Sequence, residues 1–157
     1  GGYGLAVEHT TNATWPAGQA VRFPANEQII NLVGHIAEHP SPLTACEYQA
    51  PAGLPIFVMH GRGHLPNLTS TTLELAGQPV EHCAFTSATY TNPDPAAQAL
   101  ARSALDAYGA LVIVPEKQLE PGATYEVTIT YVNGVDEWQF HTSNDVAPYR
   151  LTHTTIQ

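Results

Sequence analysis

The amino-acid sequence predicts a mainly β protein, an antiparallel β-sandwich with one or two short helices in an insertion and a connecting loop. Two patterns support this fold class: a strictly alternating run that ends in a hairpin signal, and turn residues that recur about every ten residues. Composition agrees, because the 157 residues are 43% hydrophobic and only 12% charged. Thr, Ser, Asn, Gln and His must therefore supply most of the polar surface.

Several segments before the C-terminal third have the composition of strands bounded by turns. They are residues 54–59, 70–75 and 80–85, and a turn over residues 76–79 joins the second to the third. A later apolar run, residues 110–114, is followed by Pro115. This short continuous run predicts a strand that is buried on both faces.

The clearest prediction is an antiparallel hairpin near the C-terminus. In residues 124–132 the apolar side chains alternate with Thr and Glu, which is the period of a strand with one buried face. The dipeptide Asn133-Gly134 follows and is a strong two-residue turn signal. With the return strand over residues 137–142, we expect one buried face made of Tyr125, Val127, Ile129, Tyr131, Trp138 and Phe140.

Two segments have helical periodicity. Residues 27–39 carry apolar side chains at helical spacing and are followed by Pro40, which would end a helix there. Residues 95–108 are rich in Ala and place Leu and Ala on one stripe. The sequence therefore predicts a helix in each segment.

A series of short motifs follows a recognisable order between residues 14 and 142. The series is Trp15-Pro16-Ala17-Gly18-Gln19, Phe23-Pro24-Ala25-Asn26-Glu27, Gly77-Gln78-Pro79-Val80, Leu119-Glu120-Pro121-Gly122 and Trp138-Gln139-Phe140-His141-Thr142. This order resembles that of the bacterial Ig-like domains that follow CAP (SCP/PR1-like) domains in secreted bacterial proteins. The resemblance implies an Ig-like β-sandwich, a secreted or cell-surface location and no catalytic residues.

The resemblance also suggests a division of the chain. Residues 1–13 form an N-terminal extension, residues 14–142 the Ig-like domain, and residues 143–157 a C-terminal tail or an added edge strand. Within the domain, residues 29–52 stand out as an insertion that contains Cys46 and one of the predicted helices.

The charge balance excludes several classes of partner. Five Lys and Arg against fourteen Asp and Glu give a formal net charge of −9. No basic cluster is present that could neutralise a nucleic-acid backbone or an anionic membrane surface, and no apolar run reaches the roughly 18 residues of a membrane span. The partners that remain are another protein, a second copy of this chain, or a carbohydrate.

Cys46 and Cys83 are the two cysteines of the chain. Paired, they would close a loop of nearly forty residues, which the chain-entropy model values at about 3 to 4 kcal/mol. The alternative is a pair of buried free thiols. We expect the disulfide, and with it an oxidising compartment outside the cytoplasm.

Eight histidines make metal binding the main alternative to a purely structural role. If Gly61–Gly63 formed a hairpin loop, His60 and His64 would face each other across it, close enough to share copper or zinc. His82 is a candidate third ligand. The competing interpretation is a set of solvated loop histidines.

A second motif, His35-Ile36-Ala37-Glu38-His39, spells H-x-x-E-H. On a helix it would place His35 and His39 on one face, with Glu38 beside them as the general base of a zinc peptidase. Against this hypothesis, Pro40 follows at once and no third ligand is apparent. Solvated histidines in the insertion are the simpler interpretation.

No other catalytic arrangement is visible in the sequence. The serines lie in no G-x-S-x-G context, the cysteines lack C-x-x-C spacing, and the glycines form no phosphate-binding pattern. Asn12 and Asn67 begin glycosylation sequons. Trp15 and Tyr48 lie outside the predicted strands, where they could contact a carbohydrate or a partner, or plug one end of the sandwich.

The sequence thus predicts a non-enzymatic, secreted or cell-surface structural or interaction module that self-associates or joins a larger extracellular assembly. No cofactor is expected for that function. The alternative is an extracellular or periplasmic protein that binds copper or zinc through its surface histidines.

Overall fold

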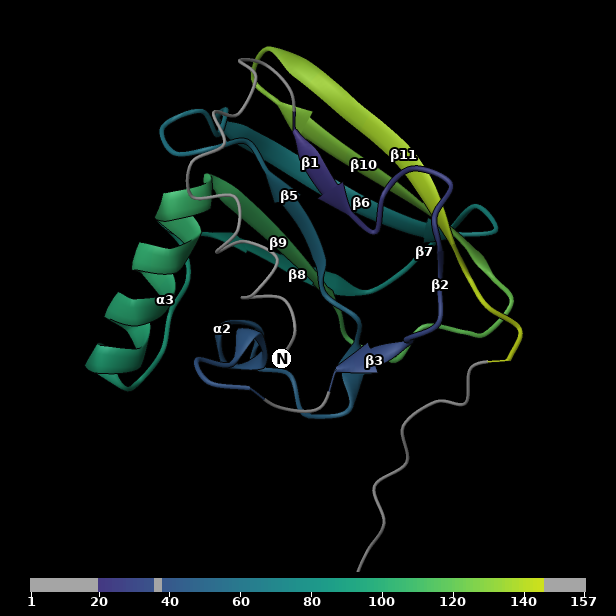
Figure 1. Ribbon diagram of the computed structural model, residues 1–157, viewed down its shortest axis with the longest axis horizontal. Helices are drawn as coiled ribbons and strands as arrows, with labels where there is room; N and C mark the ends of the chain where they lie inside the picture. The colour runs from purple at the N-terminus through teal and green to yellow at the C-terminus, as the bar shows by residue number, and fades with distance from the viewer. Residues whose placement is uncertain (1–19, 36–37, 146–157) are drawn as a thin grey trace, which may run out of the picture.

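The computed structural model describes residues 20–35 and 38–145, which form antiparallel sheets packed against each other as a sandwich (Figure 1). The first sheet consists of β1 (Val21–Phe23), β5 (Ile56–Met59), β9 (Ala110–Pro115) and β8 (His82–Thr86), in that order. The second consists of β2 (Ile29–Ile30), β11 (Gly134–Thr142), β10 (Thr124–Tyr131), β6 (Leu68–Leu75) and β7 (Gln78–Pro79). A small additional sheet pairs β3 (Gly34–His35) with β4 (Ala52–Gly53). The predicted mainly β, sandwich-like fold is confirmed.

The predicted C-terminal hairpin is β10 followed by β11, which pair antiparallel from Tyr131 and Gly134 to Thr124 and His141. All six side chains expected on its inner face are buried. The turn lies one residue earlier than the sequence signal, because Val132 and Asn133 form it while Gly134 already pairs with Tyr131 as the first residue of β11.

The main core lies between the two sheets. Ile56 and Val58 of β5 and Leu111 and Ile113 of β9 pack there against the inner face of the hairpin. Each of these four side chains is fully buried, and burial of one such side chain stabilises the fold by about 1.5 to 3 kcal/mol. This core holds the two sheets together.

Helix α3 (Pro95–Tyr108) covers part of the outer face of the first sheet and matches the predicted helix. The helix begins where the Asp94 carboxylate accepts a hydrogen bond from the Ala96 N–H at 3.0 Å, a common N-cap arrangement. Leu105 of α3 packs in a second apolar cluster with Val112 and Val114 of β9. Residues of β9 are therefore buried on both faces, as the continuous apolar run predicts.

Another part of that face, over β8 and β9, is covered by the short helix α2 (Pro42–Cys46) and its disulfide. Cys46 and Cys83 are bonded, with their Cα atoms 5.7 Å apart, so the predicted disulfide is present and attaches α2 to β8. Tyr48 packs against the same apolar cluster. Burial, together with the carboxylates of Glu81 and Glu116, raises the pKa of its phenol.

The helix expected over residues 27–39 is wrong. β2 lies in this segment and pairs in parallel with the end of β11, and β3 follows it. Ile29 is 69% exposed whereas Ile30 is buried, as expected for an extended chain whose neighbouring side chains point to opposite sides. The pairing with β11 joins residues more than a hundred positions apart, and no local pattern reveals it.

Several predicted parts of the chain lie outside the described residues. They are the extension over residues 1–13 with its sequon at Asn12, Trp15, Ile36 and Ala37 of the H-x-x-E-H motif, and the tail from Val146 onward. The predicted insertion, residues 29–52, contributes β2 to the second sheet, β3 to the small sheet and α2 to the layer over the first sheet.

Candidate functional site

Residues 60–64 do not form the hairpin on which a facing pair of His60 and His64 would depend. The strand before them, β5, belongs to the first sheet, whereas the next strand, β6, belongs to the second. The segment therefore crosses between sheets, and the His60 N–H donates to the Gly109 carbonyl at the end of α3 at 3.1 Å. His64 lies exposed beyond this crossing.

His60 instead joins a polar cluster at the rim of the sandwich, which we call the rim cluster: Arg22, His60, Tyr131, Asp136 and Trp138. The Arg22 guanidinium makes a two-point ion pair with the Asp136 carboxylate, and its Nε–Oδ2 distance is 3.0 Å. The guanidinium carbon lies 5.1 Å from the centre of the Trp138 ring, within the range of a cation–π contact. His60 Nε2 hydrogen-bonds the Tyr131 hydroxyl at 2.8 Å.

The electrostatics of the rim cluster keep His60 and Tyr131 uncharged at neutral pH. Burial lowers the pKa of His60, with a further lowering by Arg22 and an opposing effect of Asp136. Burial, reinforced by Asp136, raises the pKa of Tyr131 to about 12. The cluster is thus a neutral hydrogen-bonded pair beside a satisfied ion pair, and its contacts connect β1 and the end of β5 to the β10–β11 hairpin.

His82 forms a second connection between the sheets. Its Nδ1 lies 2.8 Å from the Val80 carbonyl and its Nε2 lies 2.9 Å from the Thr71 hydroxyl. Because a carbonyl only accepts, Nδ1 carries a proton, and in the neutral ring Nε2 accepts from Thr71. Both ring nitrogens are therefore engaged, and the bond to Thr71 joins β8 to the edge of β6.

The H-x-x-E-H motif lacks the helical spacing on which the peptidase hypothesis depends. His35 belongs to β3, whereas Glu38 and His39 lie outside regular structure. His35 Nε2 is 3.9 Å from a Glu38 carboxylate oxygen, and His39 is exposed. Over residues 20–35 and 38–145, no three His, Cys, Asp or Glu side chains gather where they could hold a metal ion. Binding of copper or zinc stays a prediction, and the positions of the described histidines do not support it.

The outer face of the second sheet carries a hydrogen-bonded chain of polar residues that the sequence did not suggest. The Glu27 carboxylate contacts His141 Nε2 at 2.9 Å and the Gln139 amide at 2.6 Å. His141 Nδ1 contacts the Thr124 hydroxyl at 2.8 Å. Hydrogen bonds from His141 and Gln139 lower the pKa of Glu27. These contacts attach the segment before β2 to β11 and β10.

An open strand edge is the most distinctive feature of the second sheet. β6 pairs with β10 along its length but with β7 only at Glu74 and Leu75. On the β7 side, the Val80 N–H donates to the Leu73 carbonyl at 2.8 Å. Backbone groups of alternate residues in a strand point to the same side, so those of Thr71 also point outward there. No described strand pairs with residues 69–72 on that side, and we call this stretch the open edge.

The open edge lacks the features that usually prevent strands from pairing with other chains. Natural edges are protected by Lys, Pro or very short strands, whereas residues 69–72 are Thr, Ser, Thr and Thr. Thr69, Ser70 and Thr72 are exposed. A register shift opposite Thr130 and Tyr131 limits the regular ladder at the N-terminal end of this stretch. The uncharged, β-branched run is the sequence signal that could have identified the edge.

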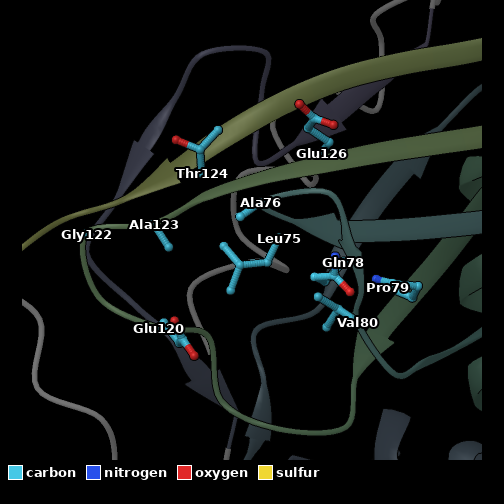
Figure 2. Close-up of a pocket in the computed structure, with 10 residues that line it drawn as sticks. All are labelled: Leu75, Ala76, Gln78, Pro79, Val80, Glu120, Gly122, Ala123, Thr124 and Glu126. Atoms are coloured by element: carbon cyan, nitrogen blue, oxygen red, sulfur yellow. The ribbon is translucent and has the colours of Figure 1, made fainter.

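Neighbouring cavities lie beside β6 and the strands next to it in the second sheet. One cavity of about 640 Å³ lies between the β6–β7 hairpin and the segment that leads into β10. Figure 2 shows Leu75 near its centre, with Ala123 and Val80 on either side and Glu120 and Glu126 at opposite ends. A shallow cavity of about 550 Å³ on the outer face shares Glu126 with it. Another of about 390 Å³ runs along β6 from Thr71 to Glu74.

Comparison with known proteins found no family model, no curated protein and no solved structure that matches this chain. None of the helices in the described residues is long and apolar enough to cross a membrane.

Proposed function

We propose that this protein is a non-enzymatic, secreted or cell-surface module that associates with a second copy of itself by strand pairing at the open edge of β6. The observation that carries the proposal is that the outward backbone groups of Thr71 have no described strand beside them, in a run without charge or Pro. An added strand satisfies such groups with main-chain hydrogen bonds.

The helices and the disulfide that lie over the first sheet support this choice of surface. α2, α3 and the disulfide occupy the outer face of the first sheet, which leaves the second sheet as the exposed one. A disulfide is consistent with an oxidising compartment such as the periplasm or the extracellular space. The resemblance to bacterial Ig-like modules agrees with a structural role there.

The direction of the backbone groups limits the register of the pairing. Two copies of β6 related by a two-fold axis must place outward-pointing groups opposite each other, and we propose the register centred on Thr71, whose outward groups have no described partner. Thr71 then lies opposite Thr71 of the second copy and Ser70 opposite Thr72, and the paired stretch ends before Leu73, whose carbonyl already accepts from Val80.

This register brings no like charges together. Glu74, the only charged residue of β6, lies outside the three paired positions, Ser70 to Thr72. Each chain carries a formal net charge of −9, so long-range repulsion opposes the dimer and salt screens it. The association is therefore expected to strengthen as ionic strength rises.

The first test removes the edge donor. Thr71→Pro deletes an N–H that faces solvent and leaves the ladder to β10 intact, because proline is tolerated at sheet edges. Thr71→Val is the matched control, since it keeps the N–H and loses only the hydroxyl that contacts His82. Sedimentation equilibrium should show self-association for the native chain and Thr71→Val, and a monomer for Thr71→Pro. Equal association of both variants, or a native chain that is monomeric at all concentrations, contradicts the proposal.

The second test determines which residues of the two β6 strands lie opposite each other. In the proposed dimer Ser70 faces Thr72 of the other copy at a non-hydrogen-bonded position, where Cα atoms lie about 4.5 Å apart and a disulfide fits. A mixture of the Ser70→Cys and Thr72→Cys variants should form a cross-linked heterodimer under mild oxidation. Each variant alone should not, because its own cysteines would be about 8 Å apart. Cross-linking of either single variant would show a different register.

A further inference from the structure

The cavity at the base of the second sheet has the chemistry of a site for a long cationic side chain. Its floor is apolar, formed largely by Leu75, Val80 and Ala123, and its ends carry the carboxylates of Glu120 and Glu126 (Figure 2). None of the residues that line it is Lys or Arg. Within residues 20–35 and 38–145, no hydrogen bond or ion pair engages either carboxylate.

A like-charged pair lies at the edge of the cavity. Glu126 of β10 lies directly opposite Glu74 of β6 in the ladder. Like charges directly opposite each other across a sheet destabilise it. A bound cation would relieve that repulsion. The adjacent outer-face cavity, which shares Glu126, adds Glu27 and Glu137 and is also lined without any basic residue.

From this geometry we propose that the cavity binds the side chain of a Lys or Arg residue carried by a basic segment of a partner protein. The aliphatic stem lies on Leu75, Val80 and Ala123 while the cationic end reaches Glu126 or Glu120. Long basic side chains bury their methylene groups in this way and keep the charge at a polar rim. Further basic residues of the segment follow the acidic outer face toward Glu74 and Glu137.

The chemistry of the cavity selects against other occupants. The two carboxylates repel an anionic ligand, and a purely apolar ligand makes no ionic contact with them. The site goes beyond the strand pairing proposed above, because neither Thr71 nor Ser70 lines the cavity. A Thr71→Pro chain should therefore retain this binding. Failure of the strand-pairing proposal can thus be distinguished from failure of the present one.

The experiment uses N-acetyl-lysine N-methylamide as the probe and follows backbone amide signals by two-dimensional NMR. Its control ligand is N-acetyl-norleucine N-methylamide, which has a similar hydrocarbon stem and no ammonium group. The lysine probe should shift the amides of Leu75, Ala76, Val80 and Ala123 in a saturable manner, with a dissociation constant of about a millimolar to ten millimolar for so small a ligand.

Two matched double variants test whether the lysine probe binds through the carboxylates of the cavity. Glu120→Gln with Glu126→Gln removes the carboxylates of the cavity and should weaken binding about fivefold. Glu116→Gln with Asp106→Asn removes the same charge from exposed positions on the first-sheet side and should leave binding unchanged. Equal binding of the norleucine probe, equal weakening by both double variants, or the absence of a saturable shift overturns the proposal.

Discussion

Arg22 of β1 and Asp136 of β11 form an ion pair that connects the two sheets at the rim of the sandwich, with the guanidinium lying over Trp138. β1 is a three-residue strand at the edge of its sheet and pairs only with β5 among the described strands. The ion pair therefore gives this short strand a second attachment.

We predict that Asp136→Asn lowers the free energy of unfolding by about 1 to 2 kcal/mol, since it removes a charge-assisted pair whose partners are only partly exposed. Urea unfolding followed by tryptophan fluorescence measures the change. Glu137→Gln, on the exposed side of the same strand, should alter stability by less than about 0.5 kcal/mol. An equal effect of the two substitutions would show that the ion pair contributes no stability of its own.

The lowered pKa of His60 predicts a pH dependence of stability. In the unfolded chain this histidine titrates near pH 6.5, whereas burial lowers its pKa in the folded state. As the pH falls below about 6.5, the unfolded state takes up the proton first, so the free energy of unfolding decreases. This contribution is fully present above that pH.

The variant that tests it is His60→Gln, which does not titrate and can still hydrogen-bond Tyr131. The loss of stability between about pH 6.5 and 5 should become shallower in this variant. His64→Gln, at an exposed position, serves as the control and should keep the native slope. At lower pH the unfolded chain also takes up a proton at Glu27, whose pKa is lowered in the folded state, and the free energy of unfolding falls further. The comparison is therefore made above pH 5. Identical slopes for His60→Gln and the native chain would refute the assignment.

The disulfide is predicted to be a major source of stability. Cys46 and Cys83 are 37 positions apart, and closure of a loop of that length lowers the entropy of the unfolded chain by an amount equivalent to about 4 kcal/mol. The Cys46→Ala/Cys83→Ala variant should lose a comparable amount in urea unfolding. Native protein reduced with dithiothreitol should lose as much. A much smaller loss on reduction than on substitution would assign the effect to side-chain packing instead of the covalent constraint.

A glycine at the end of α3 is predicted to be indispensable. Gly109 has φ 52°, and a Cβ placed there would lie 2.0 Å from the Gly61 carbonyl oxygen, which is backbone and cannot move aside cheaply. Gly109→Ala should therefore destabilise the fold by about 3 kcal/mol or more. Gly77 also has a positive φ, 76°, but a Cβ added there would meet no atom within 4 Å. Gly77→Ala should cost only about 1 kcal/mol of backbone strain, and comparable losses at the two positions would contradict the steric argument.

Local patterns predicted most of the strands because one-sided burial imposes a period of two. The alternating run of β10 indicates one buried face, and the continuous apolar run of β9 indicates burial on both faces. The helix α3 shows the helical period over fourteen residues. The same reasoning failed for residues 27–39. There the spacing of apolar side chains fits a helix, but Ile30 enters the core from a short strand held by β11.

The candidate sites were less predictable than the strands. The sequence singled out histidines by their number and spacing, yet Tyr131 and Thr71, which hydrogen-bond His60 and His82, lie 71 and 11 positions away from them. Spacing along the chain does not report which side chains meet when strands from different sheets converge. The composition of β6 is compatible with an open edge, but strand order decides that this strand has one.

The sequence by itself therefore determined the class of fold, the hairpin, the helix α3 and the one available cysteine pair, because each follows from local periodicity or from composition. Only the tertiary structure decided which strand has an unpaired side, which carboxylates share a hollow, and that His60 and His82 join the two sheets. These relationships depend on backbone hydrogen bonds and contacts between residues far apart in the chain, and they exist only once the sheets have assembled.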